Sequence, residues 1–89
     1  MSAKDVPAPI DCALHDYVEI ACLFRYHVAI TMRDAERVTG TAKTTETLSD
    51  KTEVLHLLTS DGLRRLPLHD LQRLQVLTEN ARFESVDFT

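Results

Sequence analysis

The sequence has no tryptophan, only two glycines and two cysteines, and no apolar run near the roughly 18 residues that a membrane-spanning helix needs. The two glycines, Gly40 and Gly62, stand alone, so the chain lacks a glycine-rich loop for phosphates. Met1 to Asp5 leads into no signal-like apolar segment, and two cysteines do not indicate an oxidising compartment. We therefore expect a cytoplasmic protein.

The chain also lacks an excess of positive charge. Fourteen acids against ten lysines and arginines give a net charge of −4, which is the wrong sign for a protein that mainly grips phosphates. Residues 1–20 set one base against four acids: Lys4 against Asp5, Asp11, Asp16 and Glu19. An acidic N-terminal part of this kind favours a basic partner over a nucleic acid.

The composition is that of an ordinary soluble domain, with 44% hydrophobic and 27% charged residues. A chain of 89 residues is large enough for one modest core. Residues 1–8 are small and polar and are interrupted by Pro7, with Pro9 following, so we expect a flexible N-terminal arm. Residues 9–89 are then a single domain.

A helix is predicted after this arm. Its apolar residues recur at spacings of three and four and share one face: Leu14, Tyr17, Val18, Ala21 and Cys22. Two starts are possible, since Asp11 can cap a helix from Cys12 and Asp16 can cap a shorter one with Glu19 as its capping-box partner. We prefer the longer helix, ending near Arg25.

The rest of the chain reads as short strands. Alternation or continuous apolar character predicts strands over 27–33, 37–43, 53–59, 63–68, 73–78 and 83–88. Residues 34–36 and 60–62 are predicted turns, and 69–72 a single helical turn. A helix capped by Asp70 remains the alternative for 70–78, because the leucines there also fit a helical stripe.

Two local features refine this prediction. Gly40 lies inside the strand 37–43, between the inward-facing Val38 and Ala42, and indicates a sharp bend or bulge. The threonine-rich stretch 44–52 has no apolar period and is predicted to be an exposed loop.

A helix followed by five to six short strands favours a mainly β fold. A short sheet of this length avoids exposed edges by curling on itself. We predict a small, bent, antiparallel barrel with an N-terminal helix, in the Sm-like arrangement, with an OB-like barrel as the alternative.

Four residues have the types that a zinc site uses: Cys12, His15, Cys22 and His27. The ten-residue gap between the cysteines is short for a zinc finger, and Cys22 belongs to the apolar helix face. We favour two ordinary small apolar cysteines over a zinc site or a Cys12–Cys22 disulfide. No metal and no cofactor is expected.

No catalytic set converges in the sequence. His15 with Asp16 or Asp11 offers only fragments of a hydrolase site, and His56 and His69 have no marked partner. We therefore expect a protein that is not an enzyme.

Direct binding of single-stranded RNA is the alternative function. The arginines that would form a basic strip are Arg64, Arg65, Arg73 and Arg82. Acids are interleaved with them, aromatics are few, and Arg64 and Arg65 point to opposite faces of a strand.

The polar side of the helix is the better candidate site. Asp16 and Glu19 project from neighbouring turns with His15 close by, and Tyr17 can bury its ring while its hydroxyl reaches the rim. With Asp11 these residues predict an acidic surface that faces a partner.

Part of the sequence is distinctive. Residues 9–12 read P-I-D-C, residues 16–22 read D-Y-V-E-I-A-C, and a strand with a D-A-E hairpin follows at 34–36. This pattern resembles the small bacterial Rof (YaeO) family of Rho-binding antiterminators. The resemblance implies an Sm-like fold and a partner, the termination factor Rho, a hexameric RNA helicase.

The resemblance also implies a mechanism, in which carboxylates obstruct the primary RNA-binding site of Rho and so compete with RNA. Family members are often richer in acids after the first cysteine, where this chain has Ala13 and Leu14. This departure shifts the weight to five predicted Rho-binding residues in a protein expected to be monomeric: Asp11, His15, Asp16, Tyr17 and Glu19.

Overall fold

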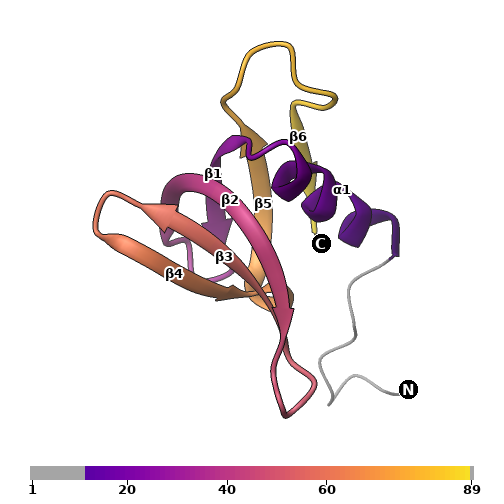
Figure 1. Cartoon of the computed structure of the whole chain (residues 1–89), viewed down its shortest axis with the longest axis vertical. Helices are drawn as coiled ribbons and strands as arrows, with labels where there is room; N and C mark the ends of the chain where they lie inside the picture. The colour runs from indigo at the N-terminus through magenta and orange to yellow at the C-terminus, as the bar shows by residue number, and fades with distance from the viewer. Residues whose placement is uncertain (1–11, 89) are drawn as a thin grey trace.

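One helix and six strands make up residues 12–88, the part of the chain that this computed structural model describes (Figure 1). The elements are α1 (Cys12–Leu23), β1 (His27–Met32), β2 (Arg37–Thr47), β3 (Glu53–Thr59), β4 (Gly62–Pro67), the 3-10 turn η2 (Leu68–Asp70), β5 (Leu71–Val76) and β6 (Ser85–Asp87). The predicted mainly β class with one N-terminal helix is confirmed. The predicted arm, residues 1–8, lies outside the described residues, as does Asp11.

The strands form one antiparallel sheet in the order β4-β3-β2-β1-β5-β6. The sheet is small and strongly bent, as expected for the Sm-like arrangement, and α1 lies to one side of it (Figure 1). Within residues 12–88, no ladder joins β4 to β6, so the sheet is unclosed rather than a fully hydrogen-bonded barrel. No helix in this range is long and apolar enough to cross a membrane.

The bend of the sheet lies in β2. The first part of this strand pairs with β1 and the second part with β3, and the register shifts between Ala42 and Thr44. A Cβ atom at Gly40 would overlap the carbonyl oxygen of Leu58 in β3. Glycine is therefore required for the two backbones to approach, and the irregularity in the pairing of this strand follows it, between Ala42 and Thr44.

The predicted loop over 44–52 is wrong in its first half. Residues 44–47 continue β2 and pair with β3 in a regular register, from Thr44 opposite His56 to Thr47 opposite Glu53. Threonine is β-branched and suits an exposed strand as well as a loop, so polarity indicated exposure and not irregular backbone. The turn is confined to 48–52, where the Leu48 amide donates to the Thr52 carbonyl at 2.8 Å.

The packed face of α1 is largely as predicted. Val18 and Ala21 are fully buried, and Leu14 and Cys22 are half-buried against the core, whereas Tyr17 lies at the exposed edge. The shorter alternative for the start of the helix is wrong, because α1 already runs through the residues before Asp16.

The helix ends at Leu23, two residues before the predicted end near Arg25. Arg25 has a φ of 53°, its amide donates to the Cys22 carbonyl at 3.1 Å, and the Tyr26 amide donates to the Ala21 carbonyl at 2.9 Å. This is a Schellman motif, in which a left-handed residue satisfies the last carbonyls of the helix and turns the chain towards β1.

Residues 71–76 form a strand, so the helical alternative for 70–78 is wrong. Leu71 and Leu74 are both fully buried at a helical spacing of three, because the register with β1 shifts between Thr31 and Met32. The irregularity puts both leucines on the core side. Their spacing therefore matches that of a helical stripe, although the segment is a strand. The predicted strand 63–68 ends at Pro67, and the last strand is three residues long instead of six.

The core is formed by one face of the bent sheet and by α1. Its fully buried large side chains are Val18, Val28, Ile30, Leu55, Leu57, Leu66, Leu68, Leu71 and Leu74. The helix contributes one of these nine, so most of the apolar surface that stabilises the fold comes from the strands.

We expect Val18→Asp to lower the free energy of unfolding by roughly 3–5 kcal/mol, because it puts an unpaired charge on the fully buried side of α1. The matched control is Leu23→Asp on the same helix, where the side chain is 73% exposed. Chemical denaturation measures both. Equal stability of the Val18 variant and the wild type would show that α1 does not pack through this face.

We expect Gly40→Ala to lower the free energy of unfolding by about 1–3 kcal/mol, because the added methyl group forces β2 away from Leu58. Thr39→Ala, at an exposed neighbouring position of β2, is the control and should have a small effect. Equal free energies of unfolding for the Gly40 and Thr39 variants would contradict the close approach.

Candidate functional site

The predicted acidic side of α1 is exposed in the structure. Asp16 and Glu19 lie three residues apart on the outward side of the helix, and the side chain of Glu19 is 58% exposed. Their separation puts the two carboxylates on adjacent turns. A basic partner can therefore reach both at once.

His15 links this part of the helix to the sheet. Its Nδ1 lies 3.3 Å from a carboxylate oxygen of Glu19, and its Nε2 lies 3.3 Å from a carboxylate oxygen of Glu53 in β3. The imidazole is only 23% exposed, while the Glu53 side chain is 42% exposed. One half-buried ring thus places carboxylates from two elements side by side.

We call Asp16, Glu19 and Glu53 together the acidic helix surface. Nothing in the sequence pattern pointed to Glu53, which appeared there only as the first residue of a predicted strand. Its membership depends on how α1 lies across the start of β3. The local spacing of residues along the sequence does not predict how a helix lies against a distant strand.

Tyr17 occupies the other flank of α1. Its ring packs edge-on against Phe83 with 4.9 Å between the ring centroids, and the residue is 36% exposed. The contact attaches the helix to the segment between β5 and β6. His15 and Tyr17 therefore hold α1 from opposite sides.

An aromatic cluster continues from this contact. The Tyr26 ring lies 6.1 Å from Phe83 and 5.7 Å from Phe24, and the Arg82 guanidinium lies 4.9 Å above the Phe24 ring. The Arg82 amide also donates to the Tyr26 hydroxyl at 2.9 Å. These aromatic rings pack mainly on one another and fix the chain that follows β5 against the end of the helix.

The zinc hypothesis gains no support from Cys22. Burial, with a smaller contribution from the charge of Glu19, raises the pKa of its thiol to about 11. At neutral pH the free sulfur therefore keeps its proton, and a thiol in this state is a poor nucleophile. The Cys12 side chain lies outside the described residues. Among the described residues, no group of three or more His, Cys, Asp or Glu side chains could hold a metal ion.

The predicted basic strip is dispersed. Each arginine has its own contact: Arg64 with Glu36 at 3.2 Å, Arg65 with Glu46 at 3.9 Å, Arg73 with Asp87 at 3.6 Å, and Arg82 with the Phe24 ring. Interleaved acids thus compensate three of the four positive charges. A continuous basic groove of the kind that tracks an RNA backbone does not follow from these positions.

Two histidines have partners that the sequence did not mark. His56 Nε2 lies 2.8 Å from Glu46, and His69 Nε2 lies 3.6 Å from Asp70. The first pair joins neighbouring strands, since β2 and β3 bring Glu46 diagonally opposite His56. Both contacts join a histidine to an acid on the same or the neighbouring element and indicate structural roles.

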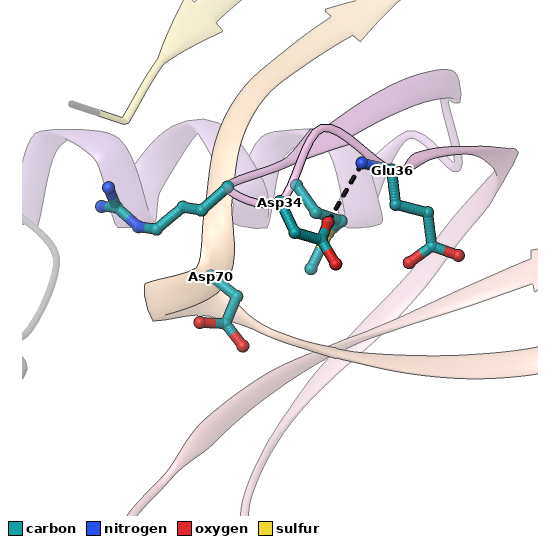
Figure 2. Close-up of a pocket in the computed structure, with 5 residues that line it drawn as sticks. Asp34, Glu36 and Asp70 are labelled. Atoms are coloured by element: carbon teal, nitrogen blue, oxygen red, sulfur yellow. Dashed lines mark hydrogen bonds between the residues drawn. The ribbon is translucent and has the colours of Figure 1, made fainter.

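A pocket of about 360 Å³ lies between the β1–β2 turn and η2 (Figure 2). It is lined by Met32, Arg33, Asp34, Glu36 and Asp70. The Asp34 carboxylate accepts a hydrogen bond from the Glu36 amide at 3.0 Å, which Figure 2 shows as a dashed line.

The other charged groups of the pocket have partners too. Arg33 donates from Nε to the His69 carbonyl at 2.7 Å, and the Glu36 carboxylate contacts Arg64. The acids of the pocket therefore stabilise the turn and its neighbours. The sequence did not predict this pocket, because it depends on the position of η2 beside the turn.

Comparisons with known proteins agree with this architecture. The family model described as "Modulator of Rho-dependent transcription termination (ROF)" matches residues 9–88. A solved structure, described as YaeO bound to magnesium from Vibrio cholerae O395, is 32% identical, covers 83% of this chain and 96% of that chain, and has a TM-score of 0.78. No curated protein matches the chain. Since the family match spans nearly the whole sequence, the chain belongs to the ROF family of modulators of Rho-dependent transcription termination.

Proposed function

We propose that this protein binds Rho through the acidic helix surface and blocks the primary RNA-binding site of Rho, and so inhibits Rho-dependent termination. The observation that carries the proposal is the pairing of Glu19 and Glu53, from two elements, with one histidine, His15, beside the exposed Asp16 on the same helix. A site that binds RNA phosphates must present basic groups. Carboxylates held at a fixed spacing are suitable competitors for the same groups.

The five residues predicted from the sequence keep distinct parts in this proposal. Asp16 and Glu19 meet basic groups of Rho directly. His15 and Tyr17 position the helix, the first through its two carboxylate contacts and the second through Phe83. Asp11 is proposed to add a further negative charge. Its position lies outside the described residues.

Rigid placement of the acids favours binding. Ordering a long side chain at an interface costs about 0.5–1.5 kcal/mol. Contacts of 3.3 Å from His15 already restrict Glu19 and Glu53, so part of this ordering precedes the encounter.

Direct binding of RNA has weaker support. The net charge is −4, and three of the four candidate arginines face a carboxylate within 4 Å. The aromatic rings that would stack with bases pack largely on one another. We therefore propose competition with RNA for Rho, by a monomer that needs no cofactor.

The double substitution Asp16→Lys with Glu19→Lys should weaken binding to purified Rho by more than about a hundredfold, because it replaces attraction by repulsion at two positions. Isothermal titration calorimetry or fluorescence anisotropy measures the affinity for Rho. Circular dichroism and thermal unfolding show whether the variant is folded. Asp11 stays unchanged, because the sequence predicts it as the cap of the helix and loss of a cap would confuse the result.

The matched control is Asp61→Lys with Glu79→Lys, which makes the same change of net charge at two exposed turns. It should bind Rho nearly as well as the wild type. Excess RNA should displace the wild-type protein, and rising salt should weaken the complex. Full binding by the folded helix variant, or equal losses in both variants, would contradict a site on α1. Wild-type binding to RNA instead of Rho would favour the alternative function.

A further inference from the structure

We propose that Leu23 is an apolar contact of the same interface, and that the partner surface therefore carries an apolar pocket beside its basic groups. This inference rests on the proposed function. It adds a component of affinity that does not depend on charge.

Leu23 lies on the same side of α1 as the two acids. Asp16, Glu19 and Leu23 follow one another at spacings of three and four residues. Residues at these spacings lie one above the other on the same side of a helix. The exposed stripe that begins with two carboxylates thus ends in a leucine one turn further on.

The side chain of Leu23 is unusually exposed for a large apolar residue. It is 73% exposed, more than any other large hydrophobic side chain in the described residues. Two other exposed apolar residues at this end of the molecule have aromatic packing partners, since Tyr17 contacts Phe83 and Phe24 stacks on Tyr26. Leu77, whose amide donates to the His27 carbonyl, also lies at this end but is less exposed, at 45%. Leu23 does not belong to the core cluster or to the residues packed against it.

The kind of partner follows from continuity with the acidic stripe. A surface that presents basic groups to Asp16 and Glu19 must also pass over Leu23, because the next turn of the helix is about 5.4 Å away. Burial of the leucine is favourable only if that surface is apolar there. A polar rim around an apolar centre is the usual organisation of protein interfaces.

A second exposed leucine provides the control. Leu63 in β4 is 52% exposed and lies opposite Leu58, which is 45% exposed. The β3–β4 hairpin projects away from α1 (Figure 1). A substitution there removes similar apolar area from a different part of the surface.

The experiment measures the affinity for purified Rho at several salt concentrations, for the wild type, Leu23→Ser, Leu63→Ser and Asp16→Asn. Leu23→Ser should bind about tenfold more weakly or worse at every salt concentration, with an unchanged slope of log affinity against log salt. Asp16→Asn should weaken binding mainly at low salt and flatten the slope. Leu63→Ser should bind like the wild type.

Wild-type affinity for a folded Leu23→Ser variant would overturn the inference, and so would equal losses for both leucine variants. A second copy of the chain is the other possible occupant. A wild-type dimer in sedimentation that dissociates in Leu23→Ser would also overturn the inference. The charge-reversal variant distinguishes the two proposals, because its failure to lose binding would contradict the acidic site itself, whatever Leu23 does.

Discussion

The fold depends on the close approach of Gly40 in β2 to the Leu58 carbonyl in β3. This approach lets one strand of eleven residues bend and pair with β1 along its first part and with β3 along its second. The bend gives the sheet a concave side that a single helix covers in part. Without it, six short strands would form a flatter sheet with more exposed apolar surface.

The helix that covers this side is held at three places. Val18 and Ala21 pack into the core, His15 contacts Glu53 in β3, and Tyr17 contacts Phe83 after β5. Elements far apart in the sequence thus fix the rotation and tilt of α1. The proposed binding of Rho depends on this rotation, because it decides which side chains of the helix face a partner.

The acidic and the basic side chains of this protein are distributed differently. Two carboxylates of the acidic helix surface, Glu19 and Glu53, share one histidine, while the arginines are spread over the sheet and mostly paired with acids. A grouped charge attracts an oppositely charged partner over about a Debye length, whereas paired charges largely cancel. Membership in a family of termination modulators and this distribution of charge agree with binding to a basic protein surface.

Elements with a regular periodicity could be predicted from the sequence. The strand in residues 27–33 and the packed stripe of α1 were both visible there, because each follows from the spacing of apolar residues along one element. The predicted loop at 44–47 and the helical alternative for 70–78 were wrong. Pairing with a neighbouring strand decides the structure of both segments. The candidate acids Asp16 and Glu19 were likewise readable from helical spacing. Only the tertiary structure added Glu53 and set Leu23 apart as exposed, because contacts across long sequence separations decide which residues become neighbours.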